Sequence, residues 1–510
     1  MFNPPMTKIT RGGRPWRARS ASFIATSILS ITLIAGAGFV AHADESSSKD
    51  QDFGATLSSV GSSEGGALGS SGTGKAPEQG DHDAFYDTDG VTTTTPGEIL
   101  KTETVPYNPA PRGMKGYVPK TVDRIMYTTT NAHGELTPVT GYIMEPRAEW
   151  KGKGERPTVI IGRGTVGQGD KCAPTRNWPL HNLQDPVQSG RGVNLEGIYD
   201  VAFAKYGVRV IVTDYIGMGT DEVHTYMNRL DQAHAMIDAG RAARNIVEKN
   251  GGKFGKVAFY GHSQGGGAST AAVEEAPNYG KDLDVAGAYA SAPPADLNAV
   301  QQNIDGSDLM GAIGFTINGM LARYPELRPL LEEHLNEEGE KALDATAEMC
   351  TDEIMDNFGH QETRNWTKDG RSLTELLKDM PDAQKALEDQ KIGNGKPEAP
   401  VMIVSGRYDR NVEYNQAKVL AKTWRDKGAS VVYKDDFMPP IGEYNHLAQA
   451  ATGAPYGLDF IIARFNDLPV KGEGGDYTTE SSLQGSSQSS SEGYGLLGSS
   501  EPFLGSSARD

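Results

Sequence analysis

A short apolar run that ends in a glycine-flanked serine limits the possible folds of this chain more than any other feature. Residues 256–262 read Lys-Val-Ala-Phe-Tyr-Gly-His, and Ser263, Gln264 and three glycines follow. The pattern predicts a strand, a tight turn and the start of a helix. A serine at such a turn sits on a strained backbone that only small neighbours permit, so its hydroxyl is exposed at the end of a sheet. A glycine-rich loop without any chemical role has the same local pattern, and the rest of the chain must decide between the two.

The net charge of the chain limits its partners. The 510 residues carry a formal charge of -18, and residues 1–43 contribute five basic side chains and no acidic ones, so the remainder carries -23. Such an acidic surface repels phosphate backbones and anionic lipid head groups. We therefore expect no nucleic-acid partner and no electrostatic docking on an anionic membrane, whereas a neutral substrate is compatible with this charge.

The N-terminal region has the pattern of an export signal. A basic stretch precedes the apolar run 23–40, and Ala41-His42-Ala43 follows before Asp44. This order predicts a signal peptide over residues 1–43 with cleavage after Ala43, and an uncleaved membrane anchor is the alternative. We therefore expect a secreted protein, extracellular or associated with the cell envelope. In an oxidising compartment the two cysteines, Cys172 and Cys350, favour a disulfide over free thiols or metal ligands.

Two Ser- and Gly-rich segments flank the central part of the chain. Residues 44–93 and 471–510 contain few apolar side chains, so they cannot bury enough surface to offset the entropy of ordering. Both are predicted to be disordered. Recurring units of an apolar residue followed by Gly-Ser-Ser give a second interpretation, in which the tails bind the cell envelope, beside the simpler one of solvated tails.

The segment between them, residues 94–470, alternates predicted strands with predicted helices. That order predicts an α/β fold with a mainly parallel sheet flanked by helices. The alternation stops over about 295–398, where a helix-rich insert would lie above the carboxyl ends of the strands as a cap or lid. The predicted strands are 97–105, 123–127, 139–144, 156–162, 208–214, 256–262, 283–291, 401–405 and 430–433, and the predicted helices are 231–249, 415–427 and 457–465, with 309–324, 326–336, 339–349 and 373–380 in the cap.

A reactive serine needs a base and an acid, which in this architecture follow it along the chain as Asp or Glu and then His. Of the ten histidines, His446 alone lies beyond the last predicted strands, in a loop that leads into the final helix. Asp409 follows the strand 401–405 in a turn, from which a carboxylate could reach an imidazole. The sequence thus predicts Ser263 as nucleophile, Asp409 as acid and His446 as base.

Several other polar residues compete for these roles. Glu413, Asp435 and Asp436 are rival acids, although the last two lie so close to His446 in sequence that they favour capping its loop. His262 adjoins the serine, but neighbours on a sharp turn point their side chains apart, so it is not expected to act as base. A turn-forming role is the simpler alternative for Asp409 itself.

Ester chemistry at a serine also needs donors for the oxyanion. The N–H of Gln264, just after the nucleophile, is one candidate, and the glycine-rich turn Gly164-Thr165-Val166-Gly167 after the strand 156–162 supplies the second. A phosphate-binding interpretation of this turn fails because no Gly-Lys-Ser or Gly-Lys-Thr closes it.

Several motifs are spread across residues 97–469. They are Gly164-Thr165-x-Gly167, Cys172-Ala173-Pro174, Asp214-Tyr215-x-Gly217-Met218-Gly219-Thr220, His224-x-Tyr226, Arg241-Ala242-Ala243, Gly261-His262-Ser263-Gln264-Gly265-Gly266-Gly267, Ala292-Pro293-Pro294-Ala295-Asp296-Leu297, Gly406-x-x-Asp409-x-x-Val412 and His446-Leu447. Taken together, these motifs resemble the secretory lipase family of α/β-hydrolases. The resemblance implies an α/β-hydrolase fold, the triad Ser263, Asp409 and His446, oxyanion donors at Val166 and Gln264, and a disulfide between Cys172 and Cys350. Arg163 departs from the histidine expected before Gly-Thr, which bears on substrate preference more than on catalysis.

The resulting hypothesis is a serine carboxylic-ester hydrolase that acts on acyl glycerols or similar neutral esters through an acyl-enzyme, with no metal or organic cofactor. An acyltransferase that passes the acyl group to an envelope lipid keeps the same residues and is the nearest alternative. An inert envelope-binding module is an alternative of another class. His224, in a matched motif before the serine, is expected to support the loop after the strand 208–214.

Overall fold

The computed structural model describes residues 83–107, 116–176, 180, 196–470 and 476–477. All of the described residues belong to one compact unit, which lies within residues 62–510. The predicted signal peptide and most of both Ser- and Gly-rich segments therefore lie outside the described residues. Within the described ranges, no helix has the length and apolarity needed to cross a membrane.

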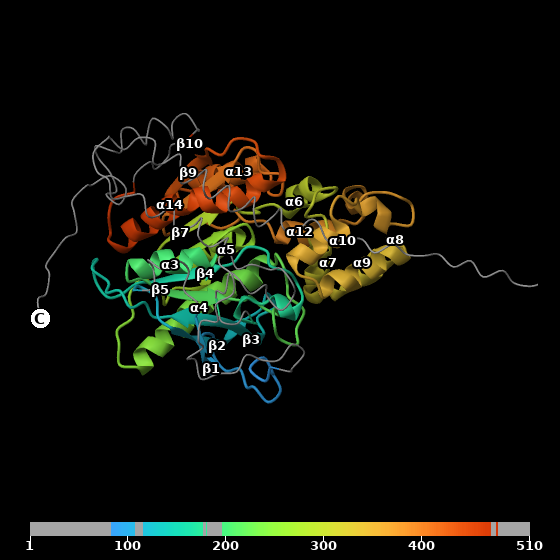
Figure 1. Ribbon diagram of the computed structural model, residues 1–510. Coiled ribbons are helices and arrows are strands. Elements are labelled where there is room, and N and C mark those ends of the chain that lie inside the picture. Colours follow the sequence, from blue (N-terminus) through green and yellow to red (C-terminus); the bar gives the residue numbers. More distant parts are fainter. Residues whose placement is uncertain (1–82, 108–115, 177–179, 181–195, 471–475, 478–510) are drawn as a thin grey trace, which may run out of the picture. The chain divides into compact units, whose positions relative to one another are not determined.

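A mixed sheet forms the centre of the described part of the chain (Figure 1). Its strand order is β1-β2-β3-β5-β4-β6-β7-β8-β9-β10. The pairs from β1 to β5 are antiparallel and every later pair is parallel. The strands are β1 (Ile99–Pro106), β2 (Thr121–Thr130), β3 (Leu136–Met144), β4 (Thr158–Gly162), β5 (Arg209–Thr213), β6 (Val257–His262), β7 (Val285–Ser291), β8 (Val401–Gly406), β9 (Val431–Asp436) and β10 (Asp476–Tyr477).

Helices cover both faces of this sheet. One face packs on α4 (Arg229–Lys249), α5 (Gln264–Tyr279) and α13 (Tyr414–Asp426), and the other packs on α3 (Gly197–Lys205) and α14 (Asn445–Phe465). The central strands β4, β5 and β6 are buried at every position. Burial on both faces explains why they read as continuous apolar runs. The predicted α/β class, with a mainly parallel sheet between helices, is confirmed.

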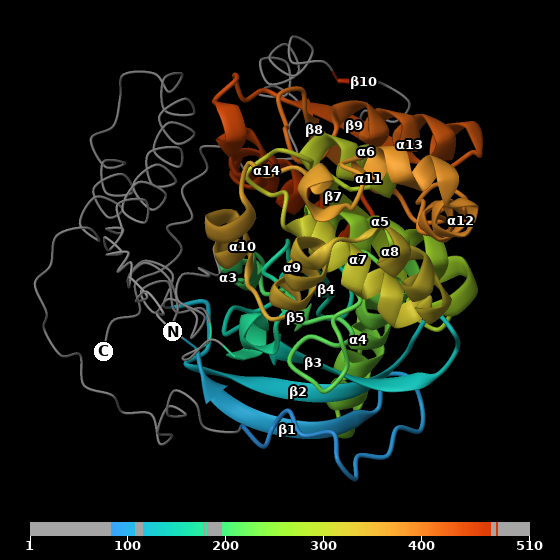
Figure 2. The same ribbon diagram turned by 90° about the vertical axis from the view of Figure 1, so that its right-hand side faces the viewer.

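The cap is a separate group of helices with its own apolar core, inserted between β7 and β8. Figure 2 looks onto it and shows α7, α8, α9 and α10 in front of the sheet. Its helices are α6 (Leu297–Ile304), α7 (Ala312–Arg323), α8 (Arg328–His334), α9 (Glu337–Ala347), α10 (Thr351–Phe358), α11 (Leu373–Leu376) and α12 (Pro381–Asp389).

Three sequence-based boundaries need correction. Packing begins before residue 94, because Phe85 and Tyr86 are buried and the Arg124 guanidinium lies 4.2 Å from the centre of the Phe85 ring. Within the predicted C-terminal tail, residues 476–477 pair with β9. The final helix, predicted over 457–465, begins at Asn445, so His446 lies in its first turn and not in a loop before it.

Candidate active site

The turn between β6 and α5 holds Ser263 in a conformation that few side chains adopt. Its φ is 57° and its ψ is -122°, a strained region for a residue other than glycine. The turn is tight enough that a Cβ on Gly261 would lie 2.3 Å from the Gly265 carbonyl group, and one on Gly265 would lie 2.0 Å from Gly162 O. The two glycines therefore let the helix start pass against β4 and β6, which leaves the serine at the carboxyl end of the sheet.

Ser263, Asp409 and His446 come together although they lie on three separate segments. His446 Nδ1 is 2.7 Å from Asp409 Oδ2, and His446 Nε2 is 2.8 Å from Ser263 Oγ. A carboxylate can only accept, so Nδ1 carries the proton and Nε2 is free to accept the serine hydroxyl. The three side chains are thus arranged for removal of a proton from Ser263 Oγ.

The surroundings of His446 favour its protonated form. Burial alone lowers its pKa, but the charge of Asp409 and the hydrogen bond to it more than offset this, and the pKa of His446 lies above its ordinary value. Asp409 is itself fixed, because its Oδ1 accepts from the Asn411 and Val412 N–H groups at 2.9 Å each. The carboxylate therefore both orients the imidazole and stabilises the charge that it gains on taking a proton.

The rival acids have other partners. Glu413 caps α13 by accepting from the Asn415 and Gln416 N–H groups. Asp435, on β9, pairs with Arg407 at 2.8 Å and accepts from the Tyr414 hydroxyl. Asp436 ends the same strand, and burial raises its pKa.

His262 packs against the base, and its Nδ1 contacts Ser291 and not the triad. Its ring centre lies 4.6 Å from that of His446, and its Nδ1 is 3.0 Å from Ser291 Oγ. Burial holds the pKa of His262 well below its ordinary value. The ring is therefore uncharged, and it packs against the His446 ring.

The two residues predicted as oxyanion donors lie on adjoining segments. Gln264 is the first residue of α5, and Val166 follows β4 in the turn 164–167. The Gln264 side chain is held by His224, whose Nε2 lies 3.1 Å from Gln264 Nε2 while its Nδ1 donates to Ile216 O. Burial lowers the pKa of His224 to about 4, so its neutral ring supports both Gln264 and the loop after β5.

Arg163, the departure from the family pattern, lies away from the serine in a buried ion pair. Its guanidinium is 2.7 Å from Asp200 Oδ1 on α3 and donates to the Tyr142 hydroxyl on β3. Arg163 thus links α3 and β3 to the start of the turn 164–167, which we call the oxyanion turn because it carries the predicted donor Val166.

Glu196 is a residue near the site that no sequence motif identified. Its carboxylate accepts from the Gly164 N–H at 2.8 Å, burial raises its pKa to about 7, and its charge acts on His446. It precedes α3 without any characteristic pattern, and only the fold brings it to the turn.

The cap contains an apolar cavity. Aliphatic and methionine side chains of α6, α7, α8, α11 and α12 line it almost entirely. Tyr226 also lines it, and its hydroxyl lies 2.7 Å from Thr165 Oγ1 in the oxyanion turn. No group of three or more His, Cys, Asp or Glu side chains within the described ranges is placed to hold a metal ion.

The fold and these residues define an α/β-hydrolase with a serine at its nucleophile turn. Its structure is similar to that of Candida antarctica lipase A in its closed state, with a TM-score of 0.66 and 21% identity over 79% of this chain and 90% of that one. The rice cell wall degrading esterase LipA of Xanthomonas oryzae, as a point mutant, gives a TM-score of 0.57 and 17% identity over 74% and 99%.

Sequence comparison gives the family. The sequence model of the secretory lipases matches residues 187–473, more than half of the chain, and the protein belongs to this family of carboxylic-ester hydrolases. A secreted triacylglycerol lipase of Malassezia restricta is 26% identical over 77% of this chain and 81% of its own length. A probable inactive lipase of Mycobacterium tuberculosis is 24% identical over 76% and 82%.

Proposed function

We propose that this protein is an exported lipase or esterase that hydrolyses acyl glycerols or similar neutral esters through an acyl-enzyme on Ser263. The observation that carries the proposal is the placement of His446 within hydrogen-bonding distance of both Ser263 and Asp409. The name of the Malassezia restricta relative, a secreted triacylglycerol lipase, supports both the substrate class and the export.

In the proposed reaction, Ser263 Oγ attacks the ester carbonyl carbon and its proton passes to His446 Nε2. The N–H groups of Gln264 and Val166 stabilise the resulting oxyanion. The bond to the alcohol oxygen then breaks, and His446 gives its proton to the departing alcohol. Water attacks the acyl-enzyme, again losing a proton to His446, and the acid leaves as that proton returns to Ser263.

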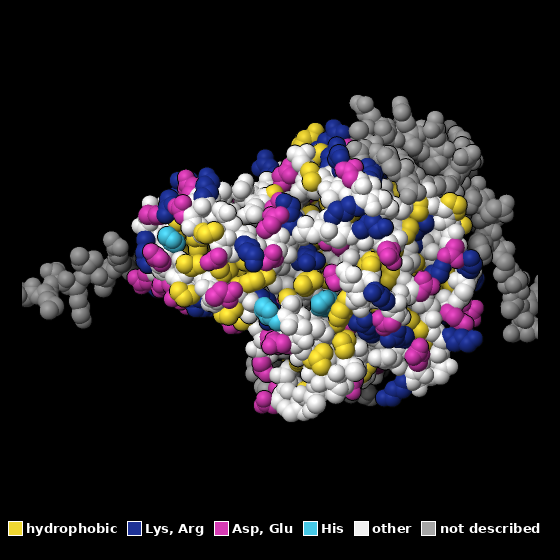
Figure 3. Space-filling view, turned by 180° about the vertical axis from the view of Figure 1, so that it is seen from behind, with side chains coloured by type: hydrophobic (Ala, Val, Ile, Leu, Met, Phe, Trp, Pro, Cys, Tyr) yellow, Lys and Arg dark blue, Asp and Glu magenta, His cyan; other side chains and the backbone are white. Residues whose placement is uncertain are grey.

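The acyl chain of the substrate would occupy the apolar cavity of the cap. Tyr226 lines this cavity and its hydroxyl lies 2.7 Å from Thr165 Oγ1, and this contact with the turn that carries Val166 supports that place for the chain. In the space-filling view of Figure 3, apolar side chains gather on the lobe formed by the cap, between acidic and basic groups. Burial of methylene groups in such a cavity contributes about 0.8 kcal/mol each, which favours an acyl substrate over a small polar ester.

Purified protein without residues 1–43 tests this proposal. We expect it to hydrolyse a series of p-nitrophenyl esters from acetate to palmitate and to lose that activity as Ser263→Ala. Ser269→Ala is the matched control, because Ser269 is a fully buried serine of α5, the helix that Ser263 directly precedes, and its hydroxyl has no hydrogen-bond partner among the described residues. An inert wild-type protein would refute the proposed ester hydrolysis and favour the alternative of an inert envelope-binding module. The name of the Mycobacterium tuberculosis relative, a probable inactive lipase, raises this alternative.

Product analysis separates hydrolysis from acyl transfer. Free acid as the main product, with and without an added acceptor alcohol, supports the hydrolase, whereas an ester of the acceptor supports the acyltransferase. Export is tested by the N-terminal sequence of the protein recovered from the culture medium, which we expect to begin at Asp44.

A further inference from the structure

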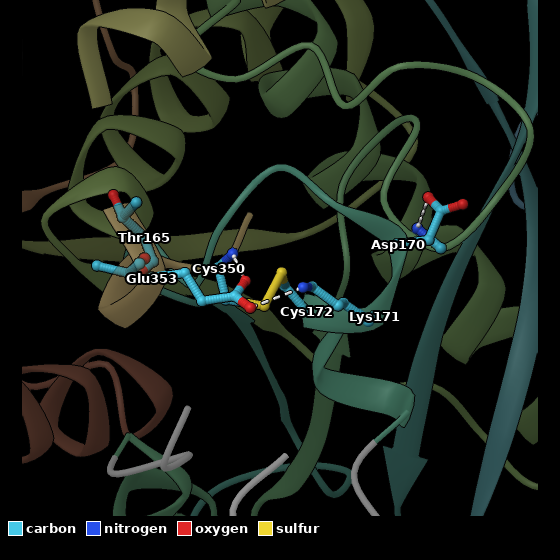
Figure 4. The surroundings of a disulfide bond; sticks show 8 residues. Thr165, Asp170, Lys171, Cys172, Cys350 and Glu353 are labelled. Carbon is cyan, nitrogen blue, oxygen red and sulfur yellow. Dashed lines mark hydrogen bonds and ion pairs between the residues drawn. A yellow bond between two sulfur atoms is a disulfide. The ribbon is translucent and has the colours of Figure 1, made fainter. Parts of the chain in front are cut away.

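The cap is joined directly to the oxyanion turn, through its residues 349–351 at the start of α10. Cys350 forms a disulfide with Cys172, and Lys171 pairs with Glu353 at 2.8 Å (Figure 4). Backbone hydrogen bonds run from the Thr351 N–H to Val166 O and from the Gln168 N–H to Met349 O, both at 3.0 Å. Residues 166–168 and 349–351 therefore pair like two short antiparallel strands.

The fit between these segments leaves no room for the turn to shift toward the cap. A Cβ on Gly167 would lie 2.5 Å from Cys350 Cα, and one on Gly169 would lie 2.5 Å from Glu348 O. Gly167 also has a φ of 144°, which glycine adopts readily. Both glycines let the turn lie directly against the cap backbone.

A side-chain hydrogen bond fixes the peptide group that contains the Val166 N–H. Thr351 Oγ1 donates to Thr165 O at 2.9 Å. In a planar trans peptide the C=O of one residue and the N–H of the next point in opposite directions. A Thr165 carbonyl held toward the cap therefore directs the Val166 N–H away from the cap.

Two further side chains, from residues outside the insert between β7 and β8, also hold this turn. The Gly164 N–H donates to Glu196, and the Thr165 hydroxyl lies 2.7 Å from that of Tyr226. Apart from the Val166 carbonyl bonded to the Thr351 N–H, no hydrogen bond of the Val166 backbone occurs within the described ranges. Its N–H is thus oriented by its neighbours and remains available to a ligand.

We propose that Thr351 is a positioning residue for the oxyanion donor Val166, so that a side chain of the cap sets the geometry of a donor in the hydrolase core. The inference rests on the function proposed above, in which Val166 N–H binds the oxyanion. Thr351 itself does not touch the substrate; it acts through the Thr165–Val166 peptide.

The test compares Thr351→Val, Thr351→Ala and Thr351→Ser with the wild type. The first measurement is kcat and KM for p-nitrophenyl butyrate. The second is the inhibition constant of phenylboronic acid, because its adduct with the serine carries an oxygen at the oxyanion position. Loss of a whole oxyanion donor would lower kcat about a hundredfold or more. We expect Thr351→Val and Thr351→Ala to lower kcat about tenfold and to keep KM within about twofold of the wild-type value. The inhibition constant should rise by the same factor. Ser, which keeps the hydroxyl, should stay within about twofold of the wild type.

Thr367→Val is the matched control, because Thr367 is a cap residue whose hydroxyl also donates to a backbone carbonyl, Arg371 O at 2.7 Å. We expect it to lower the melting temperature but to leave kcat unchanged. Three results would overturn the inference. Thr351→Val could lower the melting temperature as Thr367→Val does but keep full kcat, or it could change only KM. The third is a loss of kcat in Thr351→Ser as large as that in Thr351→Val. Failure of the proposed function is recognised separately, as an inert wild type or an active Ser263→Ala.

Discussion

Replacing Asp409 with asparagine separates the charge of this residue from its shape. In the wild type, one carboxylate oxygen accepts two backbone N–H groups, of Asn411 and Val412, and the other accepts from His446 Nδ1. An asparagine keeps the two loop bonds only if its amide oxygen faces the loop. Its NH2 group then faces His446 Nδ1 and requires that nitrogen to be unprotonated, which places the imidazole proton on Nε2, where it cannot accept from Ser263.

The size of the loss follows from two contributions. Turning the amide over to restore the active tautomer sacrifices two backbone hydrogen bonds, at about 1 kcal/mol each. Loss of the negative charge beside the imidazolium in the transition state costs about 4 kcal/mol at an effective dielectric constant of about 20. The sum, about 6 kcal/mol, corresponds to a fall in kcat on the order of 10⁴-fold.

The assay is kcat for a p-nitrophenyl ester, with Glu413→Gln and Asp435→Asn as matched controls. Glu413 caps α13 through its oxygens, so the glutamine variant should keep kcat within about twofold. Asp435→Asn weakens the pair with Arg407 and should lower the melting temperature while leaving kcat largely intact. An Asp409→Asn enzyme that retains more than about a hundredth of the wild-type kcat would contradict the tautomer argument, and a large loss in either control would identify a rival acid.

Two further predictions concern pH and the disulfide. Because the pKa of His446 lies above its ordinary value and the base must be neutral, kcat/KM should rise with pH and reach half its plateau above pH 6.5, the ordinary pKa of a histidine. In a pH-rate profile, a midpoint below pH 6.5 would contradict a net rise of the pKa by Asp409. The disulfide closes a loop of 178 residues. Replacing both cysteines with alanine should therefore lower the free energy of unfolding, measured by urea titration, by about 5 kcal/mol. A loss below about 1 kcal/mol would show that loop closure does not determine the contribution of the disulfide.

The central sheet and the triad were accessible from sequence because each has a local signature. Strands buried on both faces appear as apolar runs, and the glycines around Ser263 mark a turn that no larger side chain permits. Asp409 and His446 follow from their order along the chain. The start of α14 lies before the predicted residue 457, and Gly453, Pro455 and Gly457, which are residues that often interrupt a helix, lie inside it. Both glycines admit Tyr289, since a Cβ would lie 2.4 Å or 2.7 Å from its side chain.

Other features depend on contacts between distant segments and have no local pattern. Phe85 and Tyr86 lie in a stretch of composition typical of disorder, yet both pack against Arg124 on β2. Glu196 and Thr351 are ordinary polar residues in sequence, and only the fold places them on the two sides of one turn. A single sequence could not identify either residue as part of the site.

The attachment of the cap at residues 349–351 restricts how the cap can move during turnover. This segment lies in the middle of the cap sequence, with α6–α9 before it and α10–α12 after it. Because its backbone is paired with the oxyanion turn and linked to it by the disulfide, a rigid displacement of the whole cap would carry the Thr165–Val166 peptide with it. Under the proposed role of Val166, such an enzyme is competent only with the cap in place. We therefore expect any opening that admits substrate to leave the contacts of residues 349–351 with the turn in place.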